Sequence, residues 1–318
     1  MVQITNYGNF QSPATVYNKN PASLYANKQK SIPLKSLPFV GNGVNLQPSY
    51  YNGGNVDLGW NIMKKYSVIQ TVRIEIEPNQ VTNAKRWIKE AVGYGYKVIA
   101  TYHKYNAPLG TDNDAELQAA ANWWKTNYKV LNASGSFIIN LMNEWGSHNI
   151  SSNDYANSYN KAINTVRSVY NGPIIIDIPG YGQETKTASD AVKGTNGGKI
   201  GDPNIILSTH IYNTAWNQGR NRFLLKQDLD ELASCGRKCI VGEFGDAKKA
   251  SGKADWSALV DYAKSNPRCW PVIGWAWNGD GSNPVPMNMI TPQFQPFVKS
   301  KPFKYTQTNY LKTIISKL

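Results

Sequence analysis

Short apolar runs alternate along the chain with segments in which apolar residues recur at helical spacing. The runs that predict strands are residues 43–46, 68–76, 97–103, 137–143, 173–178, 204–210, 239–243 and 271–277. The segments that predict helices are residues 56–65, 81–94, 114–128, 154–169, 186–192, 221–234, 255–265 and 306–316. This alternation predicts a parallel sheet with helical crossovers, and eight strands favour closure into a (β/α)8 TIM barrel over an open doubly wound sheet.

Local signals support a single barrel domain. Asp114 is expected to cap the helix that it begins, and Gly93 and Gly95 close the preceding one. No Gly-x-Gly-x-x-Gly follows the first expected strand and no phosphate loop occurs in the chain, so a nucleotide-binding fold has no support. Residues 1–38 lack periodicity and are rich in Asn, Tyr, Ser and Pro. We therefore expect residues 1–38 to be an N-terminal extension packed on a catalytic barrel of residues 39–318.

Two carboxylates stand at the carboxyl ends of expected strands, where barrel active sites are built. Glu144 follows the apolar run of residues 137–143, and Glu243 ends the run of residues 239–243. One carboxylate in such a place is more often part of an ordinary strand-to-loop transition. Two at the ends of two barrel strands point into the same mouth, and such a pair is the minimum equipment for cleaving a glycosidic bond.

Further strand-end residues fit this chemistry. An arginine such as Arg73 beside a nucleophilic carboxylate would hold it ionised, while the second carboxylate and desolvation would raise the pKa of the acid. Tyr212 is placed to orient the nucleophile, and His210 ends the same strand. The polar residues expected to sense the sugar 2-hydroxyl are Asn45, Glu75, His103 and Asn143. The aromatic residues expected to stack on sugars are Trp145, Tyr181, Trp216, Trp275 and Trp277.

Five segments resemble glycoside hydrolase family 5, and most closely its endo-β-1,4-mannanases. They are Ile138-Ile-Asn-Leu-Met-Asn-Glu-Trp-Gly146, Ile174-Ile-Ile-Asp-Ile-Pro-Gly-Tyr-Gly-Gln183, Ser208-Thr-His-Ile-Tyr212, Ile240-Val-Gly-Glu-Phe-Gly245 and Gly274-Trp-Ala-Trp-Asn-Gly279. The resemblance covers residues 40–290. It implies an acid/base role for Glu144 on strand four and a nucleophile role for Glu243 on strand seven. It also implies supporting roles for Arg73, His103, Asn143, His210, Tyr212 and Trp275.

The resemblance implies a retaining endo-β-1,4-mannanase that acts on mannan or glucomannan. Cellulases of the family share the catalytic set, so an endo-β-1,4-glucanase stays open. A non-catalytic carbohydrate-binding relative is disfavoured because both carboxylates and their supports are intact. Strand two departs from the pattern, since Arg73-Ile-Glu-Ile-Glu-Pro78 has more acids than we expect. We expect no metal and no other cofactor, because the carboxylates are needed as acid and nucleophile and Arg73 would repel a cation.

Composition excludes several other classes of protein. The net charge is +13, but the 34 Lys and Arg are scattered, so we expect no nucleic-acid partner. No apolar run approaches the roughly 20 residues that span a bilayer, so we expect no membrane partner. The chain has 10 Trp and 19 Tyr, more than a core of Val, Leu and Ile requires, and sugars stack on exposed aromatic faces. We expect a monomer whose partner is a polysaccharide.

The three cysteines, Cys235, Cys239 and Cys269, cluster around the last two expected strands. A metal site is not supported, because the Cys-x3-Cys spacing has no histidine near it. In a secreted enzyme a disulfide from Cys235 to either Cys269 or Cys239 is plausible. The sequons Asn132-Ala-Ser134 and Asn149-Ile-Ser151 are compatible with secretion, and we expect an extracellular protein.

Overall fold

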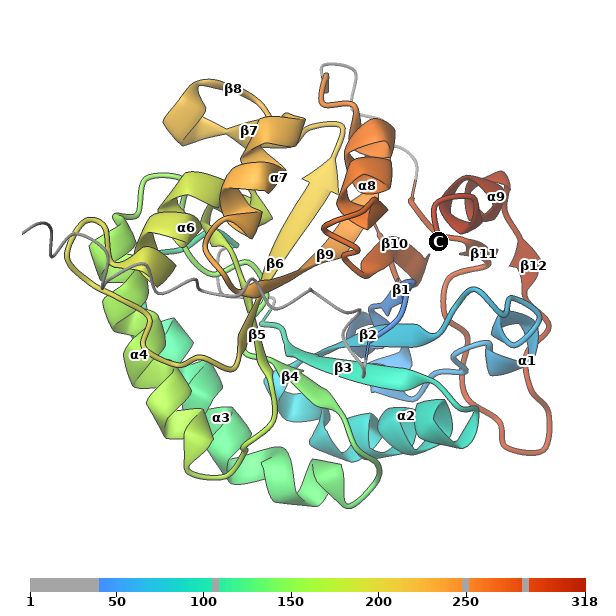
Figure 1. Cartoon of the computed structure of the whole chain (residues 1–318). Coiled ribbons are helices and arrows are strands. Elements are labelled where there is room, and N and C mark those ends of the chain that lie inside the picture. Colours follow the sequence, from blue (N-terminus) through green and yellow to red (C-terminus); the bar gives the residue numbers. More distant parts are fainter. Residues whose placement is uncertain (1–39, 105–108, 248–251, 282–285) are drawn as a thin grey trace, which may run out of the picture. The chain divides into compact units, whose positions relative to one another are not determined.

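Eight parallel strands form a closed barrel, which confirms the predicted (β/α)8 fold (Figure 1). The structure is a computed structural model that describes residues 40–104, 109–247, 252–281 and 286–318. The barrel order is β1-β10-β9-β6-β5-β4-β3-β2. The strands are β1 (Gly43–Leu46), β2 (Thr71–Ile76), β3 (Lys97–Tyr102), β4 (Ile138–Asn140), β5 (Ile174–Asp177), β6 (Ile205–Tyr212), β9 (Lys238–Gly245) and β10 (Val272–Asn278). The extension expected at residues 1–38 lies outside the described residues.

Helices follow the strands and cover the outside of the barrel (Figure 1). The helices are α1 (Trp60–Met63), α2 (Val81–Gly93), α3 (Asp114–Asn132), α4 (Ser152–Arg167), α5 (Pro179–Gly182), α6 (Thr185–Lys193), α7 (Lys226–Ala233), α8 (Trp256–Lys264) and α9 (Asn309–Ile315). Short 3-10 helices cover Pro48–Tyr50, Asn52–Gly54, Pro78–Gln80 and Gln218–Arg220. The cap expected at Asp114 is wrong by one residue, because the Asn113 side chain accepts the hydrogen bond from Ala115 N.

Three predicted helices are shorter than expected. The first begins only at Trp60, because Gly59 stands at its N-cap with φ +71° and donates its N–H to Asp57 Oδ1. Residues 221–223 belong instead to a hairpin of β7 (Trp216–Asn217) and β8 (Arg222–Phe223). Residues 306–307 form β12 (Thr306–Gln307), which pairs with β11 (Ile290–Thr291). Local strand pairing therefore replaces helix at these two boundaries.

The barrel interior is built in layers, which follow from the alternation of side chains along a strand. An apolar floor comes from one residue on or beside each of seven strands, namely Val40, Ile99, Ile138, Ile175, Ile206, Ile240 and Ile273. Two residues further along their strands lie Thr101, Asn140, Asp177 and Ser208, all fully buried. The intervening residues pack outward against the helices in the main core. A polar layer thus lies directly above the apolar floor, on the side of the carboxyl ends of the strands.

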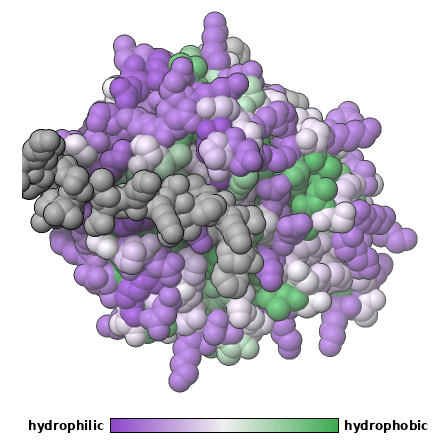
Figure 2. Space-filling view, in the orientation of Figure 1, coloured by the Kyte–Doolittle hydropathy of each residue, from purple (hydrophilic) through white to green (hydrophobic). Residues whose placement is uncertain are grey.

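The helices, the surface and the cysteines each bear on an expectation from the sequence. Within the described residues, no helix combines the length and apolarity needed to cross a bilayer. The face in Figure 2 is mainly hydrophilic, with separate hydrophobic patches. The expected disulfide is wrong, since Cys235, Cys239 and Cys269 are free. The Cys239 thiol donates to Arg237 O and the Cys269 thiol to Asn266 Oδ1, so these two thiols have local acceptors.

Candidate active site

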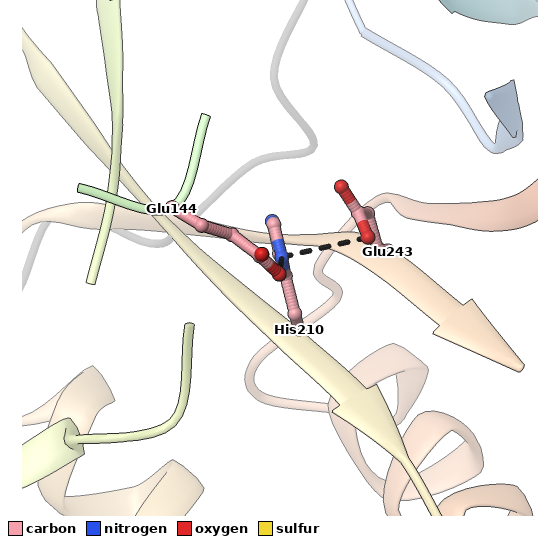
Figure 3. Close-up of side chains that lie close together, drawn as sticks. All are labelled: Glu144, His210 and Glu243. Carbon is pink, nitrogen blue, oxygen red and sulfur yellow. Dashed lines mark hydrogen bonds and ion pairs between the residues drawn. The ribbon is translucent and has the colours of Figure 1, made fainter. Parts of the chain in front are cut away.

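Glu144 and Glu243 lie together at the carboxyl end of the barrel. Glu243 is on β9, the seventh barrel strand, and Glu144 is in the loop after β4, the fourth. His210 of β6 lies between them (Figure 3). One oxygen of each carboxylate and one ring nitrogen of His210 lie within 4.8 Å of one another. This separation matches the roughly 5 Å between the two carboxyl groups of a retaining glycosidase.

Arg73 of β2 is the centre of the polar layer beneath the two carboxylates. Its Nη1 donates to Glu243 Oε1 at 2.8 Å, and its Nη2 donates to Asn143 Oδ1 at 2.6 Å. The other partners of the guanidinium are Asn45, Glu75, Asn140 and Asp177. Arg73 is fully buried, which opposes its charge, but the surrounding carboxylates outweigh burial and raise its pKa. Arg73 therefore remains a cation and fixes the residues that surround it.

Glu243 is surrounded by donors. Besides Arg73 at Oε1, it accepts the Tyr212 hydroxyl at Oε2 over 2.6 Å. Burial and the charge of Glu243 raise the pKa of Tyr212 well above its usual value, so the phenol keeps its proton and donates it. Both oxygens of Glu243 thus receive hydrogen bonds, which fix the orientation of its carboxyl group.

Glu144 has surroundings that favour its protonated form. Burial raises its pKa, the hydrogen bond with His210 lowers it, and the charge of Glu243 raises it again, so that the net direction is upward. The Glu144 backbone has φ +47°, a conformation that side-chain-bearing residues rarely adopt, and its N–H donates to Asp177 Oδ2 at 3.0 Å. The two carboxylates are close in space but have different hydrogen-bond partners.

His210 links the two carboxylates to Asp177. Its Nδ1 is 2.8 Å from Glu144 Oε1 and 3.6 Å from Glu243 Oε2, while its Nε2 is 3.5 Å from Asp177 Oδ2. Burial lowers the pKa of His210, but the charges of Glu243 and Asp177 raise it well above the usual value. Asp177 is buried too, yet His210 and Arg73 lower its pKa. His210 therefore lies among three carboxylates, those of Glu144, Glu243 and Asp177.

Asp177 was not predicted as a site residue. It ends β5 after a run of isoleucines, just as Asn143 and Glu144 follow an apolar run after β4. The same criterion of a polar residue at the end of a buried strand would have found it. Its importance depends on contacts from Arg73 and from the Glu144 backbone, which no local sequence pattern reveals.

The acidic end of β2 forms a side network around His103. His103 Nδ1 is 3.2 Å from Glu77 Oε1 and contacts the Tyr50 hydroxyl, and its Nε2 is 3.8 Å from Glu75 Oε2. Burial alone would lower the pKa of His103, but Glu75 and Glu77 outweigh it and raise the pKa. The extra acids noted in the sequence are therefore the neighbours that raise the pKa of His103.

Two of the residues expected to sense the sugar 2-hydroxyl are in the wrong place for contact. Asn45 is fully buried, donates to Gly242 O at 3.0 Å and accepts from Arg73. Glu75 is also buried, between Arg73 and Gln47 Nε2 at 2.9 Å. Both are supports beneath the site because their polar atoms are already bonded to protein. Asn143 remains suited to the role, since Arg73 takes its carbonyl oxygen and leaves the amide nitrogen as the end for a ligand.

The expected aromatic residues divide into two groups. Trp145 packs on Tyr155, and Trp277 donates to Leu58 O at 3.0 Å, and both are fully buried in the core. A ring with no exposed face cannot stack on a sugar, so these two assignments are wrong. Trp275 is 8% exposed and packs beside Tyr212.

Tyr181 and Trp216 belong to the exposed group. Tyr181 is 40% exposed and Trp216 is half-buried. Tyr181 is in α5, which follows β5, and Trp216 is in β7, which follows β6. The structure thus keeps three of the five expected aromatics at or near the carboxyl ends of the strands.

Among the described residues, Glu144, His210 and Glu243 each offer an atom of a type that binds metals, and these atoms lie within 4.8 Å of one another. The guanidinium of Arg73, 2.8 Å from Glu243, opposes a cation there through direct charge repulsion. The donor set therefore fits proton transfer better than metal binding. Independence from metal stays a prediction.

Comparisons with known proteins place this geometry in a family. The chain is 24% identical over 272 residues to Endoglucanase 1 of Saitozyma flava, covering 80% of this chain and 75% of that protein. It is 23% identical over 188 residues to a mannan endo-1,4-beta-mannosidase of Cellvibrio japonicus (strain Ueda107), covering 57% and 41% of the two chains. The solved catalytic domain of a mannanase from Streptomyces sp. SirexAA-E shares the fold, with a TM-score of 0.65, 18% identity and coverage of 88% and 85%.

A family match covers more than half of the chain. The model described as Cellulase (glycosyl hydrolase family 5) matches residues 56–281, which include β2 to β10 and both carboxylates. The resemblance seen in the sequence is therefore confirmed. The chain belongs to glycosyl hydrolase family 5, and it is a glycoside hydrolase by that membership.

Proposed function

We propose that the protein is a retaining endo-β-1,4-mannanase that cleaves mannan or glucomannan by double displacement. The observation that carries the proposal is the pair of carboxylates within 4.8 Å, one held by two donors and the other with a raised pKa. A retaining mechanism needs such a pair, because one group attacks the sugar and the other supplies a proton.

In the first step Glu144 protonates the glycosidic oxygen while Glu243 attacks the anomeric carbon. The bond to the leaving sugar breaks, and a covalent glycosyl ester forms on Glu243. Arg73 and Tyr212 hold the Glu243 oxygens so that one lone pair faces the anomeric carbon. Asn143, fixed by Arg73 at 2.6 Å, presents its amide nitrogen to the sugar.

In the second step Glu144 acts as a base. Once Glu243 is an ester its negative charge is gone, and one cause of the raised pKa of Glu144 disappears with it. Glu144 is then able to take a proton from water, which attacks the anomeric carbon and releases Glu243 as a carboxylate. Two inversions at the same carbon give net retention.

The preference for mannan is supported by the five resembling segments and by the similarity to the Cellvibrio japonicus mannosidase. A second candidate is an endo-β-1,4-glucanase, favoured by the similarity to Endoglucanase 1 of Saitozyma flava. Mannose and glucose differ in the orientation of the 2-hydroxyl. A site that hydrogen-bonds this hydroxyl in one epimer rejects the other epimer, because the polar groups of the site are then left unpaired. Asn143 is the group for that contact.

A reducing-sugar assay on mannan, glucomannan, carboxymethylcellulose and xylan tests the substrate. Mannan or glucomannan should be turned over fastest, and mannohexaose should give mainly dimers and trimers early in the reaction. Faster turnover of a β-glucan would select the second candidate. Monosaccharide as the main early product would contradict internal cleavage.

The chemistry is tested by the first-formed anomer and by two variants. NMR of the initial product should show the β anomer. Glu243→Gln and Glu144→Gln should each lower kcat by at least about 10²-fold on the polymer, since a positioned acid alone contributes roughly 10²–10⁴-fold. Asp261→Asn, on the surface of α8, is the control and should leave kcat unchanged. An α anomer, or near wild-type turnover by Glu243→Gln, would overturn the mechanism.

A further inference from the structure

Asp177 is a fully buried carboxylate at the end of β5 that takes no part in the two proposed chemical steps. Its Oδ2 accepts from Glu144 N at 3.0 Å and from Arg73 Nη2 at 3.4 Å, and its Oδ1 accepts from Asn140 Nδ2 at 3.3 Å. Each of these neighbours is a hydrogen-bond donor. An ionised carboxylate, whose two oxygens only accept, is the side chain that matches them.

The contact between Asp177 and Glu144 lies just beyond the point where β4 leaves the barrel sheet. Backbone pairing of β4 with β5 ends at Leu141 N, which donates to Ile175 O at 2.9 Å. Three residues later, the Asp177 side chain takes the place of a backbone carbonyl of β5 as the acceptor. The carboxylate thus extends the contact between the two strands to the residue that carries the proposed acid.

Glu144 is held there in a backbone conformation that its own preferences disfavour. Its φ of +47° lies in the left-handed region, and such strain persists only where surrounding contacts maintain it. Both polar groups of the Glu144 backbone are bonded, because its N–H donates to Asp177 and its carbonyl accepts from Gly110 N at 2.9 Å. The backbone conformation sets the direction of the side chain, so these two bonds determine where the carboxyl group points.

Asp177 also lies behind the residue that contacts the Glu144 carboxyl group. His210 Nδ1 is 2.8 Å from Glu144 Oε1, and the other ring nitrogen of His210, Nε2, is 3.5 Å from Asp177 Oδ2. The contacts therefore close a ring that runs from the Glu144 backbone through Asp177 and His210 to the Glu144 carboxyl group. One buried carboxylate supports the acid at its backbone directly and at its carboxyl group through His210.

We propose that Asp177 is the positioning residue of the acid/base, which keeps the Glu144 carboxyl group within reach of the glycosidic oxygen. The inference rests on the proposed function, in which Glu144 protonates the leaving sugar. Without the acceptor at Oδ2 the strained turn relaxes, and a displacement of about 1 Å in a reacting group lowers the rate about 10²-fold. The nucleophile keeps its own donors, Arg73 and Tyr212. Formation of the glycosyl ester should therefore be slowed only where the leaving group needs a proton.

The test compares two leaving groups through kcat/KM, which reports the steps up to formation of the glycosyl ester. The sugar released from mannohexaose must be protonated, whereas the phenolate released from 2,4-dinitrophenyl β-mannobioside needs no proton. If β-glucan proves the faster substrate, cellohexaose and the corresponding cellobioside are used. Asp177→Ala should lower kcat/KM on the hexaose about 10²-fold and leave kcat/KM on the dinitrophenyl glycoside unchanged.

Asp177→Asn should show a smaller loss of the same kind. The amide keeps the size of the side chain but accepts at one end only, so either Glu144 N or Asn140 Nδ2 then faces a donor. Asn140 cannot relieve this conflict by turning its own amide around, because its oxygen already accepts from Arg73 Nε at 2.9 Å. The order of the losses on the hexaose should be Ala, then Asn, then the wild type.

Tyr155→Phe is the matched control. The fully buried Tyr155 hydroxyl donates to the backbone carbonyl of Asp177 at 2.7 Å, so its removal weakens the fold around Asp177 but leaves the carboxylate in place. This variant should lower the melting temperature while the ratio of kcat/KM on the two substrates stays at the wild-type value. The same selective loss in Tyr155→Phe as in Asp177→Ala would overturn the positioning role, since it would come from general damage to this region.

A double-mutant cycle tests whether Asp177 acts through Glu144. Glu144→Gln alone should depend on the leaving group in the same way, and adding Asp177→Ala should cause no further loss on the hexaose. Losses that multiply would mean that Asp177 acts on another group. Equal losses on both substrates in Asp177→Ala would mean that it acts on the nucleophile or the whole site. Either result overturns the positioning role.

The outcomes also separate this inference from the proposed function. If Glu144→Gln shows no dependence on the leaving group, the acid role of Glu144 fails and the inference fails with it. If Glu144→Gln shows the dependence and Asp177→Ala does not, only the positioning role fails. The melting temperature of each variant shows whether it is folded. If Asp177→Ala does not fold, Asp177→Asn decides in its place, and a wild-type ratio of kcat/KM in that variant would overturn the positioning role.

Discussion

Glu144 shows most directly how function and stability oppose each other at a single residue. It is buried, it faces Glu243, and it sits in a backbone conformation that few residues with side chains adopt. Burial and the charge of Glu243 are unfavourable for an ionised carboxyl, and the positive φ is unfavourable for any residue with a side chain. Such conflicts are expected at active sites, where local rules are broken for the sake of chemistry.

Replacing Glu144 by Gln should therefore stabilise the protein at neutral pH. The pKa of Glu144 is raised in the folded state, so the wild type loses stability as pH rises from the unfolded value, about 4.3, through the folded pKa. Gln does not ionise and does not share this loss. Urea denaturation at pH 4 and pH 7 should show the variant gaining on the wild type as pH rises. A gain that shrinks with rising pH would contradict the assignment.

Single-residue roles were predictable where position alone decides them. Arg73, His210, Tyr212 and the two carboxylates lie on barrel strands or just after one, and they meet because the strands of one barrel converge on a shared site. The aromatic assignments failed at Trp277 because pairing of β10 shifts register after Gly274, so simple alternation no longer tells which way a ring points. Contacts between distant strands are absent from any local pattern.

At the level of elements, the strands were predicted more accurately than the helices. Each of the eight barrel strands overlaps its predicted run, because a strand buried on both faces leaves a continuous apolar signal. Helix ends were predicted less accurately. Gly59 delays the start of α1 through its backbone conformation, and the β7–β8 hairpin replaces the predicted start of α7 through strand pairing. The short turn α5 was not predicted at all, although it contacts His210 through Gly182.

The close approach of α5 to β6 predicts different costs of substitution for two glycines with the same φ angle. Gly182 and Gly236 both have φ +78°, but a Cβ at Gly236 meets nothing within 4 Å. Gly236→Ala should cost about 1–2 kcal/mol from the left-handed conformation alone. Gly182→Ala should cost about 1–3 kcal/mol more from overpacking against His210, and should lower kcat. Equal free energies of unfolding for the two variants would show that this contact is loose.

At the level of the whole molecule, stability depends on one closed barrel and its helical cover. The apolar floor and the outer core hold the barrel and its helices together. The described cysteines are free, so no disulfide among them adds to this stability. Expecting a disulfide from spacing and compartment failed because cysteine positions in sequence do not fix where the thiols point.

The thermal stability of the protein should therefore not respond to reducing agents. The melting temperature with and without dithiothreitol should agree within experimental error, since no disulfide among Cys235, Cys239 and Cys269 is there to be reduced. A thiol titration under denaturing conditions should count all three. A clear fall in melting temperature with reductant would reveal a bond in solution that the structure does not contain.

The contacts of Arg73 have a consequence for the history of such a protein. Five of its six partners lie on barrel strands, and Asn143, the sixth, stands directly before Glu144. The interval between the reacting groups is thus set by a rigid planar cation anchored in the sheet. Insertions, deletions and exchanges in the longer outer loops leave that anchor where it is. Mutations in those loops can therefore change which substrates are bound, while Arg73 and the two carboxylates keep their positions.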